Sequence, residues 1–201
     1  EHKEKKFKKR ILVTGTYHDY GIHIEDEGYR DVGIPSQLIN VMIDNTDVFW
    51  KIRLHPVMAS FHFDKINSFL REKFQESENV NWAKYNNISL GAALEGCSGH
   101  ITVASASALD AAQCSVPTIL VGCPGISDKK HADFYFSEYI KSGMMTFVDS
   151  SKFSSKSLDL FTGALQNRYG ENIKSSGEEN FSNFIKHLTD DQDKDIKSYD
   201  F

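Results

Sequence analysis

Short apolar runs alternate along this chain with longer segments that are apolar on one face only. The runs are rich in Val, Ile, Leu and Phe, are apolar on both faces, and end at Gly, Pro or polar residues, which is typical of strands buried in a parallel sheet. They predict six strands, near residues 10–15, 48–54, 79–82, 100–104, 118–122 and 144–148. Helical spacing of apolar residues predicts helices between them, near residues 35–45, 61–74, 90–97, 106–114 and 131–141.

This alternation predicts an α/β fold: a Rossmann-like, doubly wound parallel sheet of about six strands, followed by a helical C-terminal tail. A chain of 201 residues holds one such domain. We expect three segments, namely a charged linker at residues 1–10, the Rossmann-like domain at residues 11–149, and C-terminal helices with an acidic end at residues 150–201. The tail helices are expected near residues 158–166 and 180–188.

Composition narrows the functional classes. The net charge of −5 argues against a general nucleic-acid binder, which would normally be basic. No apolar stretch is long enough to span a membrane and no secretion signal is visible, so we expect a cytoplasmic protein. Six basic side chains between Lys3 and Arg10 are interpreted as a solvated end. The alternative is peripheral contact with an anionic surface at the inner face of a membrane.

Cysteines and histidines do not suggest a metal centre. Cys97, Cys114 and Cys123 show no C-x-x-C spacing and sit in or beside apolar segments, so buried, reduced thiols are expected. His100 and His131 have no partner at metal-ligand spacing. We therefore expect neither a metal nor a cofactor.

Ligands of open α/β sheets bind beyond the carboxyl ends of strands, where the strand order reverses. Gly15, after the first strand, would let a ligand or a facing domain approach the backbone beside Thr16, or it simply ends the strand. His55, after Arg53-Leu54, is held at the strand end by Pro56 and is placed to donate to a phosphate oxygen. The alternative is a histidine bonded to a nearby carbonyl.

The fourth strand ends in Ser105-Ala106-Ser107 and leads directly into a predicted helix. Small side chains at a helix start let a phosphate reach free N–H groups, and both hydroxyls can donate. The other interpretation is structural, because Ser107-x-x-Asp110 resembles a capping box with Asp in place of Glu. One serine could cap while the other binds.

Two further segments could line the crevice. The connection from Thr16 to Ile34 holds five Asp or Glu residues without apolar periodicity, and is expected to be a long loop. Its acidic stretch offers Glu27 as a weak candidate for a general base, although a solvated acidic loop is the preferred interpretation. Trp82 and Tyr85 follow the third strand, where either ring could stack on a base or pack in the core.

Taken in order, several of these segments resemble a known family. Arg53-Leu54-His55-Pro56, then the run at residues 101–112, then Val116-Pro117-Thr118 are similar to the C-terminal donor domain of GT-B glycosyltransferases. The similarity covers residues 10–148 and is strongest to bacterial sialyltransferases and related capsule or lipopolysaccharide enzymes, which carry an HP pair and a serine-rich motif.

The resemblance implies roles for individual residues. His55, Ser105 and Ser107 would contact the phosphate of a CMP-linked donor without a metal, and Gly15, Thr16, Arg53, Tyr85 and Asp110 would be further donor or cleft contacts. Teichoic-acid polymerases have a serine element to which Ser107 and Asp110 are loosely similar, and members with UDP donors usually carry Glu near Asp110, where it binds ribose. The acidic run at residues 25–28 matches the sialyltransferase motif that supplies the acceptor base, but that motif belongs to the N-terminal domain.

The implied function is donor binding for transfer of a sugar to a glycan or lipid acceptor in surface polysaccharide synthesis. The N-terminal, acceptor-binding domain would be absent from this chain. Three alternatives stay open: a UDP-sugar glycosyltransferase, a sugar-nucleotide 2-epimerase, and a non-catalytic nucleotide-binding module.

Overall fold

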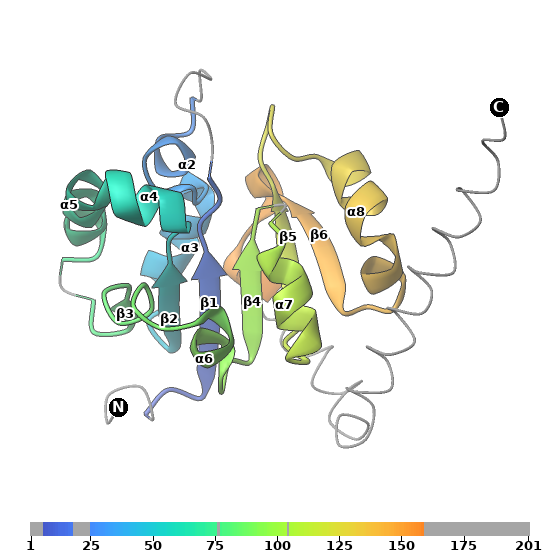
Figure 1. Cartoon of the computed structure of the whole chain (residues 1–201), viewed down its shortest axis with the longest axis horizontal. Coiled ribbons are helices and arrows are strands. Elements are labelled where there is room, and N and C mark those ends of the chain that lie inside the picture. The colour runs from blue at the N-terminus through green and yellow to red at the C-terminus, as the bar shows by residue number, and fades with distance from the viewer. Residues whose placement is uncertain (1–5, 18–24, 76, 104, 159–201) are drawn as a thin grey trace, which may run out of the picture.

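Six parallel strands form one sheet in the order β3-β2-β1-β4-β5-β6 (Figure 1). The computed structural model describes residues 6–17, 25–75, 77–103 and 105–158. Its strands are β1 (Lys9–Thr14), β2 (Val48–Arg53), β3 (Val80–Asn81), β4 (Gly99–Thr102), β5 (Thr118–Gly122) and β6 (Met145–Asp149). The predicted Rossmann-like, doubly wound fold is confirmed. The expected linker was too long, because Lys9 and Arg10 already pair with Val48 and Phe49.

Helices occupy the connections between strands. They are α2 (Glu27–Val32), α3 (Ser36–Asp44), α4 (Pro56–Phe61), α5 (Phe63–Lys73), α6 (Leu90–Leu94), α7 (Ser107–Gln113) and α8 (Lys129–Lys141), with the 3-10 helix η1 (Ser150–Lys152) after β6. The helix expected near residues 61–74 is α5, and the short helix α4, which precedes it and meets it at His62, was not predicted. The expected tail helices fall almost entirely outside the described residues.

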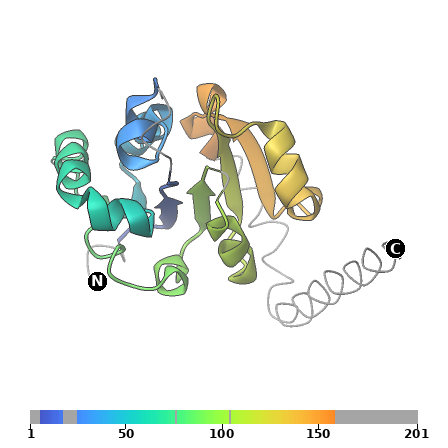
Figure 2. The same cartoon turned by 45° about the horizontal axis from the view of Figure 1, so that its top comes forward.

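Alternating side chains of the central strands enter different cores. Ile11 and Val13 of β1 join a cluster with Leu38 of α3 and Leu70 of α5. The intervening Leu12 joins a second cluster with Ala111 of α7. Figure 2 shows the sheet between the blue helices α2 and α3 and the green helices α6 and α7. This two-sided burial explains why the strands are continuously apolar.

Polar groups also lie within the sheet. The Lys51 ammonium donates to the carbonyl oxygens of Ala93 and Glu95 at 3.1 and 2.9 Å, and so satisfies the end of α6. His100 is fully buried on β4, and its neighbours Thr14 and Thr118 lie on the two flanking strands. None of the helices in the described part of the chain is long and apolar enough to cross a membrane.

Candidate donor-binding crevice and a neighbouring cleft

The carboxyl ends of β1, β2 and β4 meet at one edge of the sheet, at the reversal of strand order. The N–H of Gly15 donates to the carbonyl of Arg53 at 2.8 Å, which ties β1 to β2 beyond the last strand residues. The hydroxyl of Thr16 donates to the carbonyl of Val103 at 2.6 Å, which ties β1 to β4. Three of the expected site segments are therefore brought together at the place where open α/β sheets bind ligands.

Ser105 and Ser107 stand at the start of α7. Ser107 is the first residue of the helix, and the Oγ of Ser105 accepts its backbone N–H at 3.3 Å. The N-cap residue is Ala106, which has no side chain to cap the helix, and Ser105 precedes it. The capping box expected from Ser107 to Asp110 does not form, because Ser107 lies inside the helix. The carboxylate of Asp110 lies one turn further on and is exposed.

The two serine hydroxyls differ in whether their protons are already used in hydrogen bonds. The Oγ of Ser107 contacts the Oγ of Thr14 at 2.8 Å and donates to the Oγ of Ser105 at 3.1 Å. Ser105 thus accepts from both the N–H and the O–H of Ser107. Its own proton has no acceptor among the described residues, so the Ser105 hydroxyl is the one left to donate to a bound group.

His55 caps the short helix α4 at the end of β2. Its Nδ1 accepts the backbone N–H of Val57 at 3.3 Å, and its ring packs beside Tyr17 with 5.5 Å between centroids. Burial lowers the pKa of His55 below its ordinary value, so the ring is neutral near pH 7. With Nδ1 as the acceptor, the proton resides on Nε2, which has no partner in the described part of the chain and can donate to a ligand.

Gly15 is required by packing rather than by a ligand. A Cβ at this position would lie 2.8 Å from the carbonyl oxygen of Val32, at the end of α2. Thr16 has both of its donors engaged, because its N–H bonds to the carbonyl of Gly33 at 3.1 Å and its hydroxyl to Val103. These two residues shape the crevice by holding α2 against β1.

Two expected donor contacts are instead internal. One nitrogen of Arg53, Nη1, donates to the carbonyls of Tyr85 and Ile88, and burial lowers the pKa of this guanidinium. The ring of Tyr85 is 1% exposed and packs in a core cluster with Leu12 and Phe49. Arg53 therefore fixes the loop after β3, and Tyr85 is too buried to stack on a nucleotide base. Trp82 is partly buried, and its ring N–H donates to the side chain of Asn67.

The acidic run has a structural role. The expectation of a long unsupported loop between Thr16 and Ile34 is wrong from residue 26 onward, where Asp26 caps helix α2. Asp26 caps α2 by accepting the N–H of Tyr29 at 2.7 Å, and it also accepts the N–H and O–H of Ser36 at 2.9 and 3.0 Å. Glu27 is exposed and lies 3.7 Å from the ammonium of Lys73. The overlooked signals were the cap residue Asp26 and the terminating Gly33.

We expect Asp26→Ala to lower the free energy of unfolding by about 2 kcal/mol, because it removes a helix cap and the link between α2 and α3. Glu27→Ala is the matched control and should change that free energy by less than about 0.5 kcal/mol, since its ion pair is exposed. Urea unfolding of both variants measures the difference. Equal effects would show that Asp26 does not hold the two helices.

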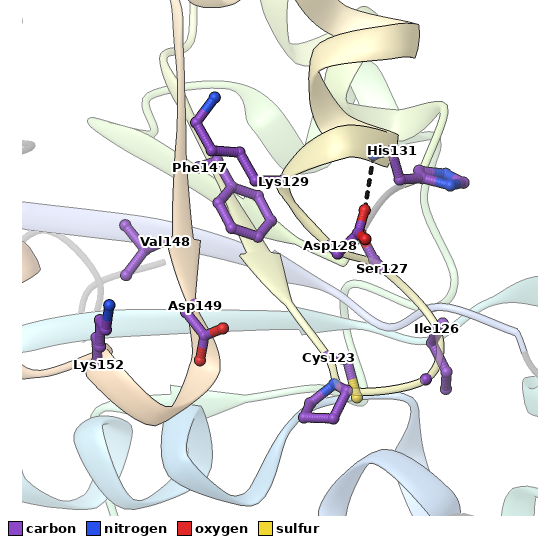
Figure 3. A pocket seen from close by; sticks show the side chains of 12 residues that line it. Cys123, Ile126, Ser127, Asp128, Lys129, His131, Phe147, Val148, Asp149 and Lys152 are labelled. Atoms are coloured by element: carbon purple, nitrogen blue, oxygen red, sulfur yellow. Dashed lines mark hydrogen bonds between the residues drawn. The ribbon is translucent and has the colours of Figure 1, made fainter.

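A second hollow lies two strands away and was not predicted. A cleft of about 900 Å³ opens between the ends of β5 and β6 (Figure 3), lined by Cys123, Pro124, Gly125, Ile126, Ser127, Asp128, Lys129, His131, Phe147, Val148, Asp149 and Lys152. Most of its charged groups are already paired. Asp128 accepts the N–H of His131, Lys129 bonds to Asp133, and Asp149 accepts the N–H and O–H of Ser151. The sequence signal was the turn after β5, where Pro124 and Gly125 are also the residues of an ordinary turn.

The described residues contain no group of three or more His, Cys, Asp or Glu side chains arranged to hold a metal ion. All three cysteines are in the reduced, thiol form. Cys123 is buried and Cys97 is half-buried, but Cys114 is exposed, which corrects the expectation that all three are buried. Cys114 lies at the end of α7, beyond the buried residues Ala108 and Ala111 of that helix.

Comparison with known proteins places the fold. No protein-family model and no curated protein matches this sequence. Two solved structures are similar. The glycosyltransferase SnogD from Streptomyces nogalater is 15% identical with a TM-score of 0.51, over 89% of this chain and 43% of SnogD. The glycosyltransferase of kitacinnamycin is 14% identical with a TM-score of 0.50, over 80% of this chain and 35% of the enzyme. The chain thus shares its fold with less than half of each enzyme.

Proposed function

We propose that this chain is the donor-binding half of a GT-B glycosyltransferase. The observation that carries the proposal is the pair of unused donors, the Ser105 hydroxyl and Nε2–H of His55, at the strand-reversal edge of a fold that glycosyltransferases share. Both donors suit a phosphate, which accepts strong charge-assisted hydrogen bonds. A nucleotide sugar bound there would place its leaving phosphate against fixed donors.

The chemistry of these residues is positioning and charge stabilisation. As the bond between sugar and phosphate breaks, negative charge builds on the phosphate oxygens, and the two donors stabilise it without taking part covalently. The acceptor and its general base would come from the remaining part of a two-domain enzyme, since the matched structures are more than twice as long as the region they share with this chain. Glu27 is exposed beside Lys73 and has no part in this role.

The finer identity of the donor follows from the sequence motifs. The HP pair and the serines favour a CMP-linked sugar, for transfer to a glycan or lipid in surface polysaccharide synthesis. The exposed carboxylate of Asp110, one turn after Ser107, supports the alternative, because an acidic residue there suits a ribose of a UDP donor. If Asp110 binds the ribose of a UDP donor, both sugar transfer from UDP sugars and 2-epimerisation are compatible with the site.

Isothermal titration of the chain with CMP, CDP, UDP, dTDP, GDP and ADP tests the assignment. We expect cytidine nucleotides to bind most tightly. A clear preference for UDP or dTDP would replace the CMP assignment and keep the donor-binding role. Absence of binding by every nucleotide would contradict the proposed function itself.

His55→Ala should weaken nucleotide binding by about 1.5–3 kcal/mol, because the lost bond joins a donor to a charged phosphate. The matched control is His55→Asn, whose side chain can still cap α4 for Val57 but has no imidazole Nε2. We expect both variants to lose affinity by calorimetry and only the alanine variant to lose melting temperature. If the asparagine variant kept full affinity, His55 would be a helix cap and nothing more.

A further inference from the structure

A buried chain of hydrogen bonds connects β5 to the proposed phosphate donor. It starts at Thr118, whose Oγ1 lies 3.1 Å from Nδ1 of His100. Nε2 of the same ring lies 2.9 Å from the Oγ1 of Thr14. The Oγ1 of Thr14 lies 2.8 Å from the Oγ of Ser107, which in turn lies 3.1 Å from the Oγ of Ser105. This series of hydrogen bonds crosses three adjacent strands and ends at the carboxyl edge of the sheet.

Which group donates in each of these hydrogen bonds is set at the buried end of the series, at Thr118. Thr118 is 0% exposed, and His100 Nδ1 is the one partner of its hydroxyl among the described residues. A hydroxyl always carries a proton, and a buried donor without an acceptor is costly. Thr118 therefore donates to Nδ1. Burial holds the pKa of His100 at about 3, so the ring is neutral and carries its single proton on Nε2.

Nε2–H of His100 donates to Thr14, which directs the Thr14 hydroxyl to Ser107 at 2.8 Å. The Ser107 hydroxyl then has two acceptors, the Oγ of Ser105 at 3.1 Å and the Oγ1 of Thr102 at 3.5 Å, and the shorter contact favours Ser105. Thr102 cannot reverse this order, because its own hydroxyl donates to the carbonyl of Thr14 at 3.2 Å. Ser105 already accepts the N–H of Ser107, so its proton is left for a ligand. In the opposite direction, Ser105 would point a lone pair at the phosphate, and the hydroxyl proton of Thr118 would have no acceptor.

We propose that His100 is a positioning residue that, held in its Nε2–H form by Thr118, makes Ser105 a permanent outward donor. The inference rests on the proposed function in that the ligand of Ser105 is a phosphate group. Neither Thr118 nor His100 touches that ligand. The fold therefore supplies a pre-oriented hydroxyl at the crevice, where a freely rotating serine would have to be ordered on binding.

The first test is spectroscopic and needs no ligand. Long-range ¹H–¹⁵N correlation spectra of the labelled chain, with the His100 signals identified by their loss in His100→Gln, report which ring nitrogen carries the proton. We expect the Nε2–H form at pH 7, and a mixture of forms in Thr118→Val, which keeps the shape and removes the hydroxyl. Thr118→Ser should restore the wild-type pattern. A ring protonated on Nδ1 in the unmodified chain would overturn the proposal.

The second test is binding of inorganic pyrophosphate, followed by calorimetry. Thr118→Val should bind it roughly fivefold more weakly, the equivalent of about one hydrogen bond, while Thr118→Ser binds as the unmodified chain does. Unchanged affinity in a folded Thr118→Val variant, in a protein whose Ser105→Ala variant loses affinity, would overturn the proposal. If the unmodified chain bound neither pyrophosphate nor any nucleotide, the proposed function would fail, and the His100 spectra would still decide the proton order.

Discussion

Replacing Gly33 by alanine is expected to lower the free energy of unfolding by roughly 2–5 kcal/mol. Gly33 ends α2 in a left-handed conformation with φ of 70°, which costs an L-residue about 1–2 kcal/mol. A Cβ there would also lie 2.2 Å from the carbonyl oxygen of Thr16, so the chain after β1 must move, which typically costs about 1–3 kcal/mol more. Urea unfolding measures the loss.

Gly125→Ala separates the two causes. Gly125 has a similar φ of 78°, but a Cβ there would meet nothing within 4 Å. This variant should lose only the backbone contribution of about 1–2 kcal/mol. Equal losses in the two variants would show that the contact between Gly33 and Thr16 is unimportant and that α2 is not clamped to the crevice as described.

Stability should fall steeply as the pH drops below about 6.5, with His100 as the main cause. Burial lowers the pKa of His100 to about 3, whereas the unfolded chain binds a proton near pH 6.5. Between these values the unfolded state holds one more proton than the folded state. The stabilisation is therefore complete above pH 6.5 and declines by about 1.4 kcal/mol for each pH unit below it.

Unfolding by urea at a series of pH values from 7 to 4.5 tests this expectation. His100→Gln removes the titrating group and should flatten the dependence, even if the variant is less stable at pH 7. His55→Asn is the control, because His55 is only partly buried and its lowered pKa contributes in the same direction but less. A slope that persists in His100→Gln would assign the pH dependence to other groups.

The fold was predictable because both sides of the sheet are covered. Continuous apolar runs such as Val48–Arg53 identify buried parallel strands, and their alternation with helices leaves few other topologies. The strand ends were less certain, since β3 has only Val80 and Asn81. Helix α2 was missed because it is six residues long and is defined by its caps rather than by apolar periodicity.

The sequence indicated which residues lie at the candidate site, but not what each side chain does there. The strand-reversal rule located His55 and the serines, and packing brought their segments together as expected. Which hydroxyl faces a ligand depends on hydrogen bonds across β1, β4 and β5, which join residues as far apart as Thr14 and Ser107 and leave no pattern in the sequence. For the same reason Tyr85 was proposed as a contact although the fold buries it, and the cleft beside β6 was not anticipated.

A nucleotide is proposed to bind in the crevice at the reversal of strand order. The direct test is a titration of the ¹⁵N-labelled chain with CMP, followed by assigned backbone amide shifts. Saturable shifts should centre on Gly15, His55 and the segment from Ser105 to Ser107. Shifts confined to the cleft residues at 123–129 and 147–152, with the crevice unchanged, would contradict the assignment and place the ligand between β5 and β6.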